Sequence, residues 1–106
     1  MKRYGSVFRI RAELAREYEQ AHERIWPEMA TAIRDSGIRR YSLFLRSDGT
    51  VFSCFECEEA GEAFAFLRRT EVYGKWQRAM ERFFVKSGPD LLGPEAEDLR
   101  EVFHLD

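Results

Sequence analysis

The amino-acid sequence predicts a mixed α+β fold, built as one domain over residues 1–106. A length of 106 residues suits a single domain, because domains commonly contain about 100–150 residues. Apolar residues alternate with others in four segments, which is the period of strands. In the segments between them they recur every three or four residues, which is the period of helices. An Asp-Gly pair joins the second and third alternating segments and indicates a hairpin.

The first strand is predicted over residues 4–10, where apolar and small side chains alternate. From Ala12 the apolar spacing changes to three and four, which predicts an amphipathic helix. Pro27 cannot lie inside that helix without removing a backbone hydrogen bond, but it fits the first position of a new helix. The first helix is therefore expected to end or bend just before this proline. A second helix is expected over residues 27–36, with Gly37 as its C-cap.

Two strands rich in aromatic residues are predicted next, over residues 40–45 and 51–57, with the Asp-Gly hairpin at residues 48–49 between them. Cys54 and Cys57 form a C-x-x-C pattern inside the second of these strands. Their spacing of three places the two thiols on opposite faces of a strand. We therefore expect two reduced cysteines rather than a redox pair or half of a zinc site.

The second helical region begins after this strand, with apolar spacing typical of a helix around residues 63–67. A break near Thr70 separates it from a further helix predicted over residues 72–84. A loop over residues 87–97, rich in Gly and Pro, leads to a last strand predicted over residues 99–105. The resulting order β-α-β-β-α-β, with both helical regions split, is the ferredoxin-like order. Such a sheet carries helices on one face only, so its other face needs a ligand, a partner or a second copy of the chain.

The charge balance and the hydropathy of the chain argue against several classes of function. The sequence contains 17 Lys and Arg and 19 Asp and Glu, a net charge of −2, which disfavours a basic groove for nucleic acid. No segment approaches the ~20 apolar residues of a membrane span, and the N-terminal residues lack the long apolar run of a signal peptide. We therefore expect a cytoplasmic protein that binds neither nucleic acid nor membrane.

The candidate functional residues are one histidine and the aromatic residues near it in the predicted fold. His22 follows Tyr18 by four residues, so the two side chains share one helix face, and its ordinary pKa suits acid–base catalysis near neutral pH. Tyr41 at a strand start and Trp76 with Gln77 on the last helix add hydroxyl, indole and amide groups. On spacing alone a place in the core is the commoner role for each of these aromatic residues, and His22 fits a half-buried place against them. The sequence contains no phosphate-binding glycine loop, nucleophile elbow or metal-ligand cluster, so no cofactor and no metal are expected.

The segment His22-Glu23-Arg24-Ile25-Trp26-Pro27-Glu28 resembles the H-x-x-I-W-P-E segment of the L-rhamnose mutarotase family. Further features agree with that family in the same order along the chain. They are a tyrosine four residues before the histidine, Gly37 with Tyr41, Trp76 in the late helix, and the ending Leu99-x-Glu101-Val102-Phe103. The resemblance therefore covers essentially the whole chain.

This resemblance implies a dimeric α+β barrel, in which two ferredoxin-like subunits pack sheet on sheet as a homodimer. It implies an isomerase that interconverts the α and β anomers of L-rhamnopyranose without a cofactor. By position His22 resembles the catalytic acid/base, and Tyr18, Tyr41 and Trp76 resemble substrate-binding residues. We expect His22 to donate a proton to the ring oxygen while a neighbouring polar group or a water completes the transfer.

Gln77 departs from the family pattern, in which a second tryptophan often follows the first. A hydrogen-bonding amide here replaces one stacking surface, so we include Gln77 among the substrate-binding residues and leave open a closely related pyranose as substrate. Two other functions share the predicted fold and remain as alternatives. One is a dimeric α+β barrel oxygenase or haem-handling enzyme with His22 as ligand or base. The other is a non-catalytic domain that binds a small metabolite.

Overall fold

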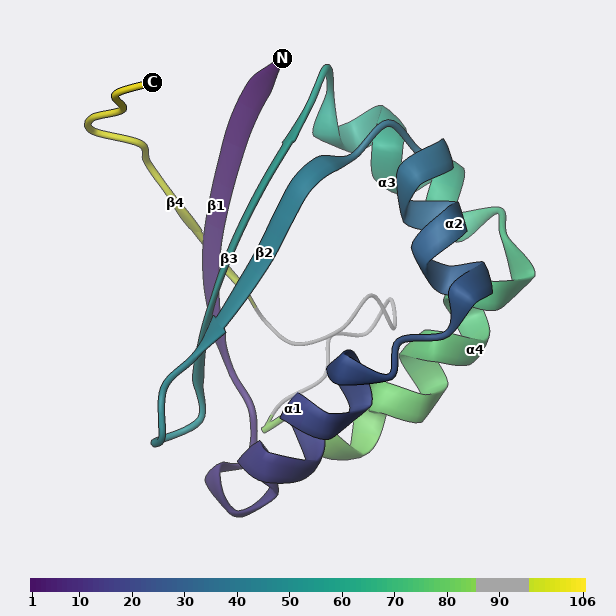
Figure 1. The fold of residues 1–106 in the computed structure, drawn as a ribbon, viewed down its shortest axis with the longest axis vertical. Helices are drawn as coiled ribbons and strands as arrows, with labels where there is room; N and C mark the ends of the chain where they lie inside the picture. Colours follow the sequence, from purple (N-terminus) through teal and green to yellow (C-terminus); the bar gives the residue numbers. More distant parts are fainter. Residues whose placement is uncertain (86–95) are drawn as a thin grey trace.

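The computed structural model describes residues 1–85 and 96–106, so most of the predicted loop over residues 87–97 lies outside the described residues. The chain forms two layers, a four-stranded sheet and a layer of helices that covers one face of it (Figure 1). Neighbouring strands are antiparallel and follow the order β2-β3-β1-β4. This order confirms the ferredoxin-like prediction. The strands are β1 (Lys2–Arg9), β2 (Arg39–Leu45), β3 (Thr50–Cys57) and β4 (Glu97–Leu99).

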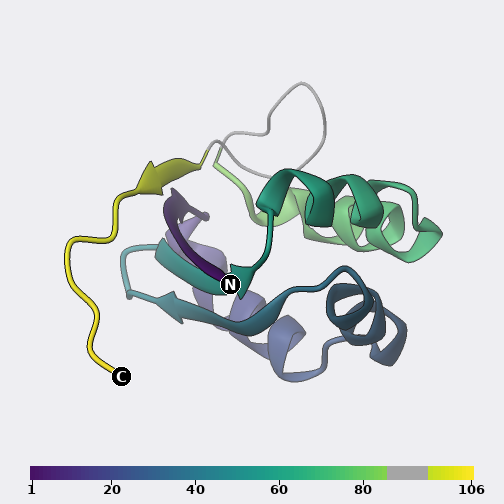
Figure 2. The same cartoon turned by 90° about the horizontal axis from the view of Figure 1, so that it is seen from above.

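Both helical regions are split, as the sequence predicts, and Figure 2 shows the two resulting helix pairs side by side. Pro27 begins the second helix of the first pair, where its missing N–H has no partner to lose. Thr70 caps the second helix of the second pair, because its hydroxyl accepts a hydrogen bond from the Tyr73 N–H. The helices are α1 (Ala15–Glu23), α2 (Pro27–Asp35), α3 (Ala60–Arg68) and α4 (Glu71–Met80), with short 3₁₀ turns at Ala12–Leu14 and Glu81–Phe83. None of the helices in the described ranges is both long and apolar enough to span a membrane.

Two glycines adopt the backbone conformations that their predicted roles require. Gly49 has φ +92° in the hairpin, and a side chain there would collide with the carbonyl oxygen of Ile10. Gly37 has φ +98° and follows Ser36, the C-cap of α2, which is the usual place of a glycine at a helix end. The two free cysteines lie on opposite faces of β3, since Cys57 is buried on the helix side and Cys54 pairs with Gly5 on the other. The predictions for the hairpin, for the helix end and for the placement of the cysteines on opposite faces are thus confirmed.

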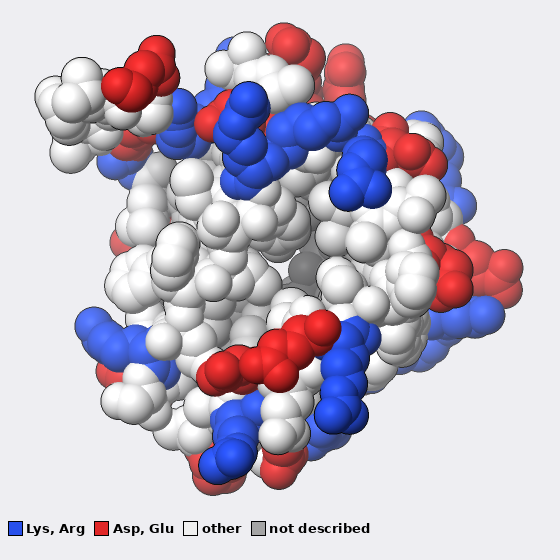
Figure 3. Space-filling view, in the orientation of Figure 1, with Lys and Arg blue, Asp and Glu red and all other residues white. Residues whose placement is uncertain are grey.

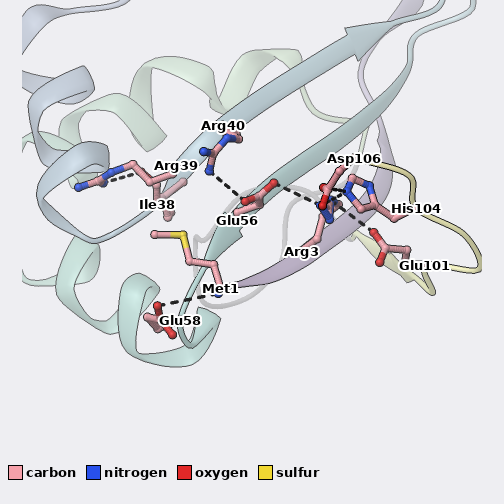
Figure 4. A network of polar contacts seen from close by, with 10 residues as sticks. All are labelled: Met1, Arg3, Ile38, Arg39, Arg40, Glu56, Glu58, Glu101, His104 and Asp106. Atoms are coloured by element: carbon pink, nitrogen blue, oxygen red, sulfur yellow. Dashed lines mark hydrogen bonds and ion pairs between the residues drawn. The ribbon is translucent and has the colours of Figure 1, made fainter.

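The last strand predicted over residues 99–105 is wrong in position. Strand β4 ends at Leu99, which pairs with Gly5 of β1, and the chain then leaves the sheet as a tail over residues 100–106 (Figure 1). Only polar side chains of this tail return to the sheet. Arg3 Nε lies 3.4 Å from Glu101 Oε2, and Arg3 Nη2 lies 2.8 Å from His104 Nε2 (Figure 4).

The apolar side chains of the tail explain why the strand prediction failed. Val102, Phe103 and Leu105 are 78–85% exposed, so residues 1–85 and 96–106 offer no surface that covers them. An alternating pattern predicts a strand because one of its faces is expected to be buried. Without a surface that covers one face, the alternating apolar side chains do not by themselves pair this segment with a neighbouring strand.

Candidate active site

A cavity of about 1100 Å³ separates the helix layer from the sheet. In Figure 3 it opens as a hollow near the middle of the face shown. Its walls are mainly apolar and aromatic, as is usual for a ligand site, and five arginines together with several other polar residues also line it. The predicted residues His22, Tyr18, Tyr41, Trp76 and Gln77 all line this one cavity.

The helix side of the cavity, here called the helix wall, brings three of the predicted residues into contact. The centre of the His22 ring lies 4.3 Å from that of Tyr18 in the same helix, and 5.5 Å from that of Trp76 in α4. Trp26, at the break between α1 and α2, packs edge-on against Trp76 at 5.1 Å. The break at Pro27 therefore places the Trp26 indole in contact with the Trp76 indole, and this contact supports Trp76 in its position.

The hydrogen bonding of His22 determines which of its ring nitrogens can take a proton. Nδ1 lies 2.9 Å from the backbone oxygen of Tyr18. A carbonyl oxygen only accepts, so Nδ1 carries the hydrogen and Nε2 of the neutral ring keeps a lone pair. Burial lowers the pKa of His22 below 6.5, and the hydrogen bond to Tyr18 offsets this only in part. At neutral pH the ring is therefore uncharged and ready to accept a proton at Nε2.

Tyr18, Tyr41 and Tyr73 line the same cavity, and two of them affect the pKa values of their neighbours. Burial raises the pKa of Tyr18, and the nearby Tyr41 phenol raises it further. The pKa of Tyr41 is about 12, raised first by desolvation and then by Tyr73. Tyr41 keeps 43% of its surface exposed because its ring borders the open cavity, while protein atoms around the cavity still desolvate the hydroxyl. Tyr18 and Tyr41 therefore stay protonated at neutral pH, so each can donate a hydrogen bond.

Sequence reasoning missed Tyr73, which is buried and also lines the cavity. A signal for it was present, since Tyr73 precedes Trp76 by three residues and shares its helix face. The spacing could not show that this face borders a cavity, because that depends on the distance between α4 and the sheet.

A β-bulge positions Tyr41 on the sheet side of the cavity. The pairing of β2 with β3 shifts between Arg39 and Ser42, and Arg40 inside this bulge has φ +50°, which is uncommon for a residue other than glycine. Glu56 holds the bulge, with its Oε1 at 3.1 Å from Arg40 Nη1, and also pairs with Arg3 of β1 (Figure 4). The strained residue therefore immediately precedes a predicted substrate-binding tyrosine.

The sheet side of the cavity, the sheet wall, contributes polar groups that the sequence analysis did not single out. Ser6 and Ser53 line it with their hydroxyl oxygens 2.6 Å apart, and Asp98 lines it as well. Within residues 1–85 and 96–106, no group of three or more His, Cys, Asp or Glu side chains could hold a metal ion.

Comparisons with known proteins place the chain among sugar-modifying enzymes. Residues 3–105 match the family model described as L-rhamnose mutarotase. The chain is 38% identical to L-rhamnose mutarotase of Bacillus subtilis (strain 168), with all of both chains covered. It is 40% identical to that of Acidiphilium cryptum (strain JF-5), over 93% of this chain and 95% of the relative. The crystal structure of L-rhamnose mutarotase from Formosa agariphila superposes with a TM-score of 0.84 over all of both chains at 23% identity, a likeness of fold.

Proposed function

The chain belongs to the L-rhamnose mutarotase family, whose members interconvert the anomers of L-rhamnose, and we propose that this cavity is where it does so. The observation that carries the proposal is the contact of His22 with Tyr18 and Trp76 on one cavity wall. With the family shown, the alternatives of an oxygenase or haem-handling enzyme and of a non-catalytic binding domain are set aside. The single domain over residues 1–106 and its cytoplasmic location stay predictions.

Anomer exchange requires that a proton leave the anomeric hydroxyl and that another reach the ring oxygen as the C1–O5 bond breaks. The open aldehyde then rotates about the C1–C2 bond, and ring closure returns both protons. A neutral His22 with a bare Nε2 supports a role as the base that takes the proton of the anomeric hydroxyl. This is the opposite first step from donation to the ring oxygen, which a protonated His22 would perform.

The second proton needs a donor near the ring oxygen. The phenols of Tyr18 and Tyr41 keep their protons at neutral pH because their pKa values are raised. Both can therefore serve as proton donors in the cavity. We assign the delivery to one of these hydroxyls or to a water that it holds. On ring closure the same groups act in reverse, so His22 returns its proton to the carbonyl oxygen that forms the new anomeric hydroxyl.

The other predicted residues bind rather than react. The Trp76 indole offers an apolar surface for the C–H face of the pyranose, and Gln77 beside it offers an amide donor and an amide acceptor. Since Gln77 stands where a second tryptophan often occurs in the family, a panel of 6-deoxy and related pyranoses is the direct way to identify the preferred sugar.

Replacing His22 with Ala tests the catalytic assignment. Exchange between the α and β anomers of L-rhamnose, followed by saturation-transfer NMR, is expected to slow about 10²–10⁴-fold. The matched control is His104→Ala in the exposed tail, which should leave exchange unchanged. Unaltered exchange in a folded His22→Ala protein would remove His22 from the mechanism, and no acceleration by the unsubstituted protein would end the proposed function.

We also propose that the chain works as a homodimer, with the outer face of the sheet covered by a second copy. Phe44 (63% exposed) and Phe52 (39%) lie opposite each other on this face, away from the helices. Together with the exposed apolar tail they form more uncovered apolar surface than a small monomer usually shows. Sedimentation analysis should show a dimer, and Phe44→Glu should convert it to a monomer, whereas Arg11→Glu at an exposed site away from this face should not. A monomeric unsubstituted chain would contradict the proposal.

A further inference from the structure

The sheet wall of the cavity carries a row of polar side chains that crosses three strands. Ser6 of β1 pairs with Ser53 of β3 on one side and with Asp98 of β4 on the other. Residues directly opposite in antiparallel strands project from the same face. All three line the cavity, and Ser53 is only 7% exposed. We call Ser53, Ser6 and Asp98 the polar row.

The rows on either side of it are apolar. On one side Tyr4 and Phe55 stack with ring centres 5.3 Å apart, and on the other Phe8 pairs with Val51. Such neighbours are typical of the inner face of a sheet that packs under helices. Two serines between them bury little apolar surface and leave room that larger side chains would fill. The polar row is therefore where the sheet wall departs from a packed core.

The serine pair presents hydrogen-bonding capacity that it does not use internally. A Ser–Ser hydrogen bond consumes one hydroxyl proton and one lone pair, so the pair retains one donor and several acceptor positions. Asp98 supplies the only carboxylate among the described residues that line the cavity, and an ionised carboxylate only accepts. Donors and acceptors in one row match neighbouring sugar hydroxyls, each of which can both donate and accept.

We propose that the polar row binds the ring hydroxyls of the sugar and so selects the sugar, opposite the catalytic histidine. This inference rests on the proposed function, because it assigns the second wall of the same site. The helix wall then performs the proton transfers, and the polar row recognises which carbons of the pyranose carry hydroxyls. Ser53 is buried and Ser6 half-buried, while Asp98 is exposed at the sheet edge. A sugar that lacks a hydroxyl recognised by the serine pair would leave a largely buried polar group unpaired, which weakens binding more than a lost apolar contact does.

The test compares the unsubstituted protein with the double variant Ser6→Ala/Ser53→Ala and with Asp98→Asn. Ser42→Ala, on the outer face of the same sheet, is the matched control. Each variant is assayed for anomer exchange of L-rhamnose over a concentration series, and binding of L-rhamnose is measured separately by calorimetry. We expect a KM for the double variant about three- to tenfold higher, with little change in kcat, and no change for Ser42→Ala.

Deoxy sugars separate recognition from a merely structural effect. Of the 2-, 3- and 4-deoxy derivatives of L-rhamnose, at least one should show a KM raised about three- to tenfold with the unsubstituted protein but no further rise with the double variant. If the double variant does not fold, Ser6→Ala alone is used, because Ser6 is less buried than Ser53.

A KM equal to that of the control, or the same deoxy penalties in both proteins, would overturn the assignment of the polar row and leave the proposed function standing. Absence of any anomer exchange by the unsubstituted protein would end the proposed function instead. Calorimetry would then still show whether the polar row binds the sugar.

Discussion

The two walls of the cavity differ in the chemistry that they can perform. The helix wall holds a neutral imidazole that can accept a proton, beside an indole and a phenol. The sheet wall holds two serine hydroxyls that do not titrate near neutral pH and a carboxylate at its edge. Under the proposal, the proton transfers belong to the helix wall and recognition of the ring hydroxyls to the sheet wall, while Trp76 and Gln77 bind the sugar from the helix side. Substitutions of the proton-transferring residues in the helix wall should therefore lower kcat, and those in the sheet wall should raise KM.

The larger effects are expected from substitutions of the two predicted tyrosines, because one belongs to each wall of the cavity. Tyr18 lies on α1 and Tyr41 on the bulge of β2. Tyr18→Phe should lower kcat about tenfold with little change in KM, because it removes a proton donor beside His22. Tyr41→Phe should raise KM about three- to tenfold with a smaller change in kcat, because it removes one hydrogen bond to the sugar.

Anomer-exchange kinetics over a range of L-rhamnose concentrations measures both parameters for each variant. Tyr4→Phe serves as the control, since the Tyr4 hydroxyl already accepts a hydrogen bond from the Ala60 N–H at the end of the sheet. Equal effects of Tyr18→Phe and Tyr41→Phe on kcat would show that the two walls share the chemistry. The division between the layers would then be wrong.

A smaller effect is expected on the free energy of unfolding as pH changes. Of the two walls, only the helix wall should contribute to it, through His22. The pKa of His22 is lower in the folded chain than its ordinary value of 6.5. Above pH 6.5 the ring is neutral in both states, so the full stability is present. As pH falls below 6.5 the unfolded chain binds the proton first, and stability is lost until the folded pKa is reached, by at most about 1.4 kcal/mol per pH unit.

Urea unfolding at pH 7.5 and 5.5 measures this loss, and His22→Asn should reduce the difference between the two pH values. The double variant Ser6→Ala/Ser53→Ala should keep the full difference, since neither hydroxyl titrates in this range. A pH dependence that is the same with and without His22 would show that burial does not shift its pKa.

Much of the secondary structure could be predicted because its causes are local. Pro27 breaks the first helical region wherever it lies, and the Asp-Gly pair at residues 48–49 favours a tight turn between any two strands. The approach of His22 to Tyr18 follows from a spacing of four in a helix. By contrast, the tail beyond Leu99 could not be placed from its alternation, because its apolar side chains are exposed and no surface of the described residues covers them.

The cavity itself belongs to the tertiary structure. Nothing local in Ser6, Ser53 and Asp98 distinguishes them from ordinary polar residues, since they are 45 or more positions apart in the sequence. Only the antiparallel pairing of three strands brings them into one row, and only the spacing between the helices and the sheet leaves that row open to a ligand. The bulge at Arg40 likewise arises from the pairing of β2 with β3 and not from the residue type.

The sequence by itself determined the ferredoxin-like order of elements, the break at Pro27 and the family to which the chain belongs. Periodicity, turn chemistry and a short motif act through neighbours along the chain, so they can be read without the fold. The tertiary structure alone decided that Tyr73 lines the cavity, that His22 is neutral with a bare Nε2, and that a polar row lines the same cavity. Those properties depend on burial and on distances between remote segments, which the order of residues does not express.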